Sequence, residues 1–413
     1  MVGPFMPDDA KLAAVRAGLP ALAAGIYLNT GSVGPLPAET ALAMAEQADR
    51  ELRVGRAHPA DWPDALARID EARAAVAAVL TTDVDRIALI QSVTHGMNLA
   101  AWALDWRPGD RVVTTGHEHA GGIAPLYVLR DRLGVEVAIV DVGDAGDDDA
   151  TLAAFEQAIT ARTRMVAVSQ VLHTTGAHLP IRRLTELAHA HGALVAVDGA
   201  QAAGAIPVDV IDLGVDLYAV AGQKWLLGPE GTGALYVAAQ ADDRIAMSTA
   251  GWHAYERLDS AGSAVPHRDA RRFQASGYHR PSVLGLGRSI GWLSMYVGLD
   301  WIHRRGTTLA AAAADRLAAI PGVRVLTPRA RMATLVTFTI DGWPAEAIVD
   351  ELGARTFAIV RSIPDLDACR LSVGFFNTDD EIERVARTVE LLAAHTPESV
   401  PRRATLAMLG ADT

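Results

Sequence analysis

Cysteine is almost absent from this sequence, since Cys369 is the only one among 413 residues. A single cysteine forms neither an internal disulfide nor a cysteine-rich metal site, which agrees with a reducing compartment such as the cytoplasm. Long apolar runs are also missing, because no stretch reaches the ~18 uncharged apolar residues of a membrane span. Residues 1–28 lack the basic and then apolar layout of a signal peptide. We therefore expect a cytoplasmic protein with no bound metal and no membrane partner.

The sequence also lacks a dense basic run. Its 37 basic residues are outnumbered by 49 acidic ones, which sets the net charge at -12 and argues against a nucleic-acid partner. Half of the residues are hydrophobic and few are aromatic, which is the balance of a soluble, Ala-rich α/β protein. A chain of this length is expected to form one large and one smaller domain. A small-molecule partner fits these features best.

Lysine is nearly eliminated, because 35 of the 37 basic residues are arginines and only Lys11 and Lys224 are lysines. Arginine does not form a stable imine with a carbonyl compound, whereas lysine does. Lys224 lies in the apolar stretch 219–225, which makes it a candidate for covalent chemistry. The alternative is that Lys224 remains by chance in a chain whose gene has a base composition that favours arginine codons.

From about residue 60 the pattern alternates between helical stretches and short apolar strands, which is typical of an α/β fold with a mostly parallel sheet. We expect an N-terminal segment (1–60) that joins the small domain and the active site, a large domain (61–300) and a small α+β domain (301–413). The predicted helices are 64–80, 309–319 and one from Asp379, and the predicted strands are 87–90, 111–114, 136–140, 165–169, 193–197, 216–220 and 233–237, with further strands near Val323, Leu335 and Arg370.

Asp198 and Lys224 each come just after a predicted strand. Because the carboxyl ends of parallel strands meet in one crevice, both side chains can reach the same ligand. Pyridoxal 5'-phosphate needs such a pair: a lysine that holds its aldehyde as an imine, and an acid that keeps its pyridine nitrogen protonated. A structural salt bridge between the two residues is the alternative.

Other polar residues also follow predicted strands. Residues 91–98 open a predicted helix and include Thr94 and His95, so their backbone N–H groups suit a phosphate. The alternative is that this segment only caps the helix, since the same residue types do so in many proteins. His119 could stack on a planar ring, while the spacing of the 117–119 segment, without a third ligand nearby, disfavours a metal site. His173 and Gln201 could contact a ring hydroxyl.

Arg361 and Arg370 flank the short segment 362–369. A guanidinium holds the α-carboxylate of an amino acid through two parallel hydrogen bonds. With 35 arginines in the chain, ordinary surface positions are the alternative.

Taken together, these segments resemble the class V aminotransferase group of fold-type I pyridoxal phosphate enzymes. That group includes cysteine desulfurases, isopenicillin N epimerase-like proteins and cystine carbon-sulfur lyases. The resemblance covers nearly the whole chain and implies a mostly parallel seven-stranded sheet and a homodimer with its active site at the interface. The motifs that carry it are, in order, 27–32, 34–37, 118–119, 175–176, 197–201, 223–225, 228–231, 370–372 and 376–378.

The resemblance implies a role for each matching residue. Lys224 is the Schiff base and proton carrier, and Asp198 pairs with the pyridine nitrogen. The remaining roles are His119 on the ring, Gln201 near the ring hydroxyl, Thr94 and the His95 backbone at the phosphate, and Arg370 with Asn29 at the substrate carboxylate. The chain departs from the family pattern at Ala221 and Gln223, where relatives often have serine and histidine. Segment 273–278 also lacks the usual Gly-Thr pair that contacts the neighbouring subunit's phosphate, which leaves Ser276 or Tyr278 as substitutes.

Cys369 bears on which reaction is catalysed. A cysteine desulfurase needs a thiolate on a mobile loop before the carboxylate arginine, but residues 328–368 contain no cysteine, and Cys369 lies on a predicted strand. The closest likeness is to the cystine lyase branch, through Trp252, Arg361 and segment 103–106. We expect β-elimination from cystine or another cysteine S-conjugate, with pyruvate, ammonia and a thiol or persulfide as products. Transamination, epimerisation and decarboxylation stay open as alternatives, as does a non-catalytic binding module.

Overall fold

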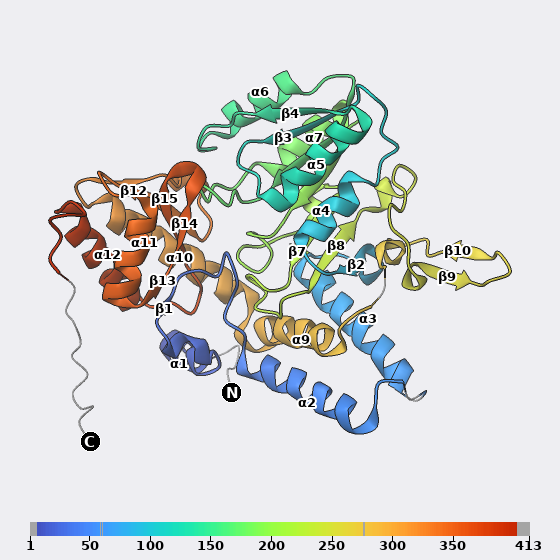
Figure 1. Cartoon of the computed structure of the whole chain (residues 1–413), viewed down its shortest axis with the longest axis horizontal. Coiled ribbons are helices and arrows are strands. Elements are labelled where there is room, and N and C mark those ends of the chain that lie inside the picture. Colours follow the sequence, from blue (N-terminus) through green and yellow to red (C-terminus); the bar gives the residue numbers. More distant parts are fainter. Residues whose placement is uncertain (1–5, 58, 60, 276, 403–413) are drawn as a thin grey trace.

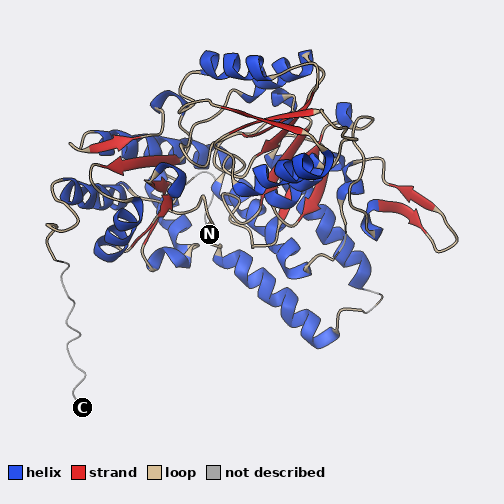
Figure 2. Ribbon diagram, turned by 45° about the horizontal axis from the view of Figure 1, so that its top comes forward, coloured by secondary structure: helices blue, strands red, loops and turns tan. Residues whose placement is uncertain are grey.

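The computed structural model describes residues 6–57, 59, 61–275 and 277–402. Figure 1 shows a large domain built on a central sheet and a smaller domain at the left. Figure 2 shows the same division by secondary structure, with helices packed around strands in both parts. No helix within the described ranges is long and apolar enough to cross a bilayer.

Seven strands form the central sheet, in the order β2-β8-β7-β6-β5-β3-β4. β8 runs antiparallel to both of its neighbours, and the other pairs are parallel, so the sheet is mostly parallel as expected. The strands are β2 (Ile87–Ile90), β3 (Arg111–Thr115), β4 (Glu136–Val140), β5 (Thr163–Ser169), β6 (Leu194–Asp198), β7 (Leu217–Ala221) and β8 (Gly233–Val237). Three of these match the predicted ranges, and the other four differ from them by one or two residues at one or both ends.

The central strands are apolar on both faces because helices cover both sides. On β5, Val166 and Val168 pack into one core, whereas Met165 and Ala167 pack into the other. The helices of this part are α2 (Ala38–Val54), α3 (Asp61–Val79), α4 (Val93–Ala101), α5 (Ala120–Leu133), α6 (Asp148–Ala158), α7 (Ile181–Ala190), α8 (Val210–Leu213) and α9 (Arg280–Gly291). A hairpin of β9 (Tyr255–Leu258) and β10 (Ala264–Pro266) projects from the large domain (Figure 1).

The small domain is a four-stranded antiparallel sheet backed by helices. Its strands lie in the order β11 (Val323–Val325), β12 (Leu335–Ile340), β15 (Ala368–Ser372) and β14 (Arg361–Ile363), and its helices are α10 (Leu299–Ala318), α11 (Ala345–Thr356) and α12 (Asp379–Ala393). The start predicted for α10, residue 309, was ten residues late. A π-helical turn at 292–297 connects α9 to α10.

The N-terminal segment packs against the small domain. After α1 (Asp8–Ala17), β1 (Ile26–Tyr27) pairs in parallel with β13 (Ala358–Ile359), and Asn29 forms a bridge with Ser372. This pairing carries residues 29–34 to the junction between the two sheets. The domain limits 61–300 and 301–413 stay predictions.

Candidate active site

The carboxyl ends of four neighbouring strands meet at one site. Asp198 is the last residue of β6, Lys224 lies three residues after β7, and His119 and His173 follow β3 and β5. The charges of Asp198 and Lys224 each act on the pKa of the other, and both act on the pKa of His119. The side chains that follow these strands in the sequence therefore lie close together in the structure, as expected.

Asp198 is buried at the base of this site, with 5% of its surface exposed. Its Oδ1 accepts a hydrogen bond from the backbone N–H of Ala200 at 2.9 Å. Its Oδ2 lies on the side of Gly122, where a Cβ would stand 3.8 Å away. Burial raises the pKa of Asp198, and the nearby charge of Lys224 opposes that rise. One carboxylate oxygen thus remains available to a ligand.

Lys224 is held in a partly buried position beside the N-terminal segment. Burial lowers its pKa to about 8; the positive charges of Arg370 and Arg361 act in the same direction, whereas Asp198 opposes them. Gly34 donates its N–H to the carbonyl oxygen of Gln223 at 2.7 Å, and a Cβ on Gly34 would stand only 2.3 Å from the carbonyl oxygen of Lys224. A lysine with a lowered pKa is a better nucleophile at neutral pH.

Two histidine rings stand edge to face beside the lysine. His119 and His173 have ring centroids 5.4 Å apart at an interplanar angle of 80°. His119 caps α5 by accepting the N–H of Gly121 at its Nδ1. His173 places its Nδ1 3.0 Å from the carbonyl oxygen of His117, and burial lowers the pKa of His173 to about 3, so its ring stays neutral.

Gln201 joins the N-terminal segment to the site. Its Nε2 donates to the carbonyl oxygen of Gly31 at 2.9 Å, and its Oε1 accepts from Nε1 of Trp225 at 2.9 Å. The amide is therefore fixed in orientation and keeps one N–H for a ligand. Gly31 was missed as a site residue, although a Cβ there would stand 3.0 Å or less from atoms of Gln201, Arg370 and Ser372.

The expected phosphate cradle lies at the start of α4. Ser92 caps this helix by accepting the N–H of His95. The helix starts of α4 and α5 touch, because a Cβ on Gly121 would stand 2.2 Å from Oγ1 of Thr94. His95 Nδ1 and Gln223 Oε1 are buried atoms with no hydrogen-bond partner among the described residues. Ser276, the other residue expected at a phosphate, lies outside the described residues.

Arg370 and Arg361 lie opposite each other on the paired strands β15 and β14. Arg370 is 1% exposed and donates from Nη1 to the carbonyl oxygen of His173 at 2.7 Å, while its Nε and Nη2 have no partner within the described chain. Arg361 is exposed and donates from Nη1 to Oγ of Ser32, which in turn donates to Oδ1 of Asn29. The structure thus brings together the two arginines and Asn29 expected at a substrate carboxylate.

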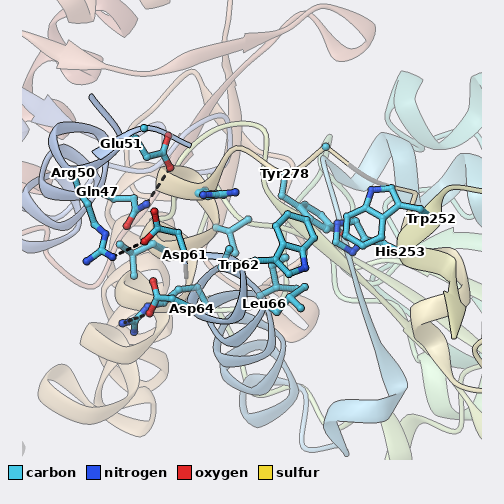
Figure 3. A pocket seen from close by; sticks show the side chains of 18 residues that line it. Gln47, Arg50, Glu51, Asp61, Trp62, Asp64, Leu66, Trp252, His253 and Tyr278 are labelled. Carbon is cyan, nitrogen blue, oxygen red and sulfur yellow. Dashed lines mark hydrogen bonds and ion pairs between the residues drawn. The ribbon is translucent and has the colours of Figure 1, made fainter. Parts of the chain in front are cut away.

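Trp252, also expected at the substrate, lies elsewhere in this chain. Figure 3 shows it lining a separate pocket with Trp62, His253 and Tyr278, and none of the residues around Lys224 lines that pocket. Its ring stacks on Trp62 at 5.2 Å and on His253 at 3.8 Å between centroids. Tyr278 donates its hydroxyl to the carbonyl oxygen of Leu89, and its expected role at a neighbouring subunit's phosphate stays a prediction. These two side chains do not enter the Lys224 site of their own chain.

The family described as aminotransferase class V matches residues 26–385. The chain belongs to this family. Membership confirms the resemblance found in the motifs, and pyridoxal phosphate is the cofactor that goes with it. A probable cysteine desulfurase of Methanothermobacter thermautotrophicus is 27% identical over 394 residues, which cover 92% of this chain and 97% of the relative.

Two solved structures of the cystine C-S lyase C-DES have the same fold. Its complex with the reaction product cysteine persulfide has a TM-score of 0.85 and 28% identity, and the match covers 90% of this chain and 99% of that one. A C-DES mutant with glycine covalently linked to the PLP cofactor has a TM-score of 0.86 and 27% identity, covering 91% and 99%. These likenesses confirm the fold-type I architecture.

Proposed function

We propose that this family member holds pyridoxal phosphate on Lys224 and cleaves the carbon–sulfur bond of cystine or another cysteine S-conjugate by β-elimination. The observation that carries the choice of reaction is the position of Cys369. It is 0% exposed on β15, opposite Phe338 and Ser362, and burial raises its pKa to about 12. A desulfurase that takes sulfur onto its own cysteine needs an accessible thiolate, and the chain has no other cysteine.

The residues present fit the cofactor. Buried polar atoms rarely lack a partner in a folded protein, so an unpartnered group marks a place where a ligand can bind. Within the described residues, His95 Nδ1 in the expected phosphate segment and Gln223 Oε1 next to Lys224 are buried atoms without partners. A carboxylate for the pyridine nitrogen and a lysine of lowered pKa for the aldehyde complete the set of partners that the cofactor requires.

When bound, pyridoxal phosphate withdraws electrons from the α-carbon of an attached amino acid. Asp198, whose Oδ1 is occupied by the backbone N–H of Ala200, would hold the pyridine nitrogen in its protonated form. The amine of Lys224 accepts the α-proton, since a pKa of about 8 leaves a fraction of it neutral at neutral pH. The neutral ring of His173 adds no positive charge that would compete with Lys224.

The arginines orient the substrate. Arg370 presents two unused donor atoms, Nε and Nη2, which together can hold one carboxylate. Arg361 lies on the adjacent strand and suits the second carboxylate of cystine. The bond between Cβ and sulfur breaks as the α-proton leaves, and the sulfur departs with its electron pair and takes a proton. Water then releases pyruvate and ammonia from the remaining three carbons.

An assay with the purified protein and cystine tests this function. We expect a visible absorption band from the bound cofactor, and pyruvate formed together with a persulfide. Lys224→Ala is expected to lose both signals. If the band bleaches without pyruvate, the enzyme transfers the amino group instead, and if no preparation shows a band, the cofactor site itself is wrong.

A further inference from the structure

Glu118 is a carboxyl at the base of the site that the proposed chemistry does not use. It follows β3 in the turn that leads to His119. Thr115 donates its hydroxyl to Oε1 at 2.7 Å, and Ser169 donates its hydroxyl to Oε2 at 2.6 Å. Both hydroxyl residues are buried, so the carboxyl is fixed between the ends of β3 and β5.

The charged group that faces Glu118 is Asp198. Ser169, which donates to Glu118, lies directly opposite Asp198 in the β5–β6 pairing. The two carboxyl groups are therefore neighbours of the same residue. Three histidines lie nearby, and their ring nitrogens contact other groups. His117 contacts Thr174 and the carbonyl oxygen of Gly143, His119 accepts from Gly121, and His173 contacts the carbonyl oxygen of His117. The charge of Lys224 acts on the pKa of Asp198 and is not among the charges that act on the pKa of Glu118.

When only one of two neighbouring carboxyls has a cation beside it, the other loses its proton at a higher pH, because each negative charge disfavours the other. Asp198 has the charge of Lys224 beside it, whereas Glu118 accepts hydrogen bonds from two hydroxyls and from the backbone of Ser169, and no cation of the described residues is among the groups that shift its pKa. Burial and the charge of Asp198 both raise the pKa of Glu118, which reaches about 7.

We propose that Glu118 is a positioning residue that stores a proton behind Asp198 and, on losing it, strengthens the hold of Asp198 on the proton that it shares with its ligand. Thr115 and Ser169 keep the carboxyl in place in both states. The site therefore carries one more negative charge on the alkaline side of neutrality than on the acid side. This charge lies beside Ser169, which is opposite Asp198 on the neighbouring strand, so it acts on the residue expected at the ring nitrogen.

Infrared difference spectroscopy of the purified protein across a pH series tests the stored proton without turnover. A protonated carboxyl has a carbonyl stretch that a carboxylate lacks and that shifts in heavy water. We expect such a band to disappear as the pH rises through neutrality. Glu118→Gln is expected to lose it, whereas Glu186→Gln, the same change on the exposed face of α7, is expected to keep it.

Ser169→Ala provides a second variant should Glu118→Gln fold poorly. The Ser169 hydroxyl favours the charged form of Glu118, so its removal is expected to move the midpoint of the band to higher pH. A band that survives Glu118→Gln, fails to move in Ser169→Ala, or is missing from the unmodified protein overturns the proposal. These outcomes are independent of the cofactor and of the reaction proposed above.

The effect on the site is read from the absorption of bound pyridoxal phosphate, and this readout alone rests on the proposed function. The unmodified protein is expected to show a spectral inflection near neutral pH that Glu118→Gln lacks. A merely structural role for Glu118 would change the amount of folded protein and leave the inflection in place, which would overturn the coupling to Asp198.

Discussion

The guanidinium of Arg370 donates from Nη1 to the carbonyl oxygen of His173 at 2.7 Å. This bond joins a strand of the small domain to the loop that follows β5 in the large domain. It turns the rest of a buried guanidinium, Nε and Nη2, toward the site without partners among the described residues. The position of the substrate carboxylate therefore depends on how the two domains pack together.

Arg370→Lys tests this carboxylate site. A lysine keeps the charge but loses the planar pair of donors, and hydrogen bonds to charged groups contribute about 1.5–3 kcal/mol each. We expect KM for cystine to rise by about 10- to 100-fold, with the visible band of the cofactor retained. Arg324→Lys, on the exposed edge of β11, is the matched control. An unchanged KM would remove Arg370 from substrate binding.

Arg361 is expected to distinguish between substrates with one and two carboxylates. Arg361→Gln removes the charge that suits the distal carboxylate of cystine while leaving Arg370 in place. We expect kcat/KM to fall for cystine and to change little for an S-alkyl cysteine, which has no second carboxylate. Equal losses for both substrates would instead place Arg361 at the shared end of the molecule.

Cys369→Ala separates elimination from desulfuration. The substitution leaves a small cavity under β15, with a cost on the order of 1 kcal/mol in stability. We expect pyruvate formation from cystine to continue at nearly the unmodified rate. Complete loss of activity in a folded variant, judged by its melting temperature, would make Cys369 a sulfur acceptor and contradict the proposed mechanism.

The lowered pKa of Lys224 predicts how the protein takes up its cofactor. Only the neutral amine attacks the aldehyde, so the rate of uptake by cofactor-free protein should rise with pH and level off above about 8, not near the ordinary lysine value of 10.5. Asp198→Asn removes a charge that raises this pKa, and Arg370→Gln removes one that lowers it. Stopped-flow absorbance should therefore show the midpoint moving down in the first variant and up in the second.

Trp252 is predicted to act on the site of a second copy in a homodimer. It lies away from Lys224 in its own chain, on the exposed pocket shown in Figure 3. Trp252→Ala and Lys224→Ala dimers are each expected to have low activity, but exchanging their subunits would create one intact site per mixed dimer. Recovery of activity on mixing supports this prediction, and no recovery, with exchange verified by mass, contradicts it.

Local patterns in the sequence were enough to predict the sheet and the acid–lysine pair. The strands β2, β4 and β8 are short apolar runs bounded by turn residues, and such runs are recognisable without knowledge of their neighbours. Because parallel strands place their carboxyl ends together, Asp198 and Lys224 could be assigned to one crevice from their positions after two strands. The same patterns could not show that β8 runs antiparallel, since direction depends on the pairing of distant segments.

Tertiary packing decided the rest of the site. The pairing of β1 with β13 brings Asn29 and Gly31 to Arg370, although more than 300 residues separate them in the chain. Trp252 matched a motif of the cystine lyase branch but stacks on Trp62. Its position depends on which surface the segment around residue 252 covers. Glu118 directly precedes His119 in the sequence, and only the folded strand ends bring it near Asp198. Local periodicity and residue type are enough to identify which residues could carry the chemistry, whereas distances, burial and unpartnered donors follow from contacts between segments that are remote in sequence.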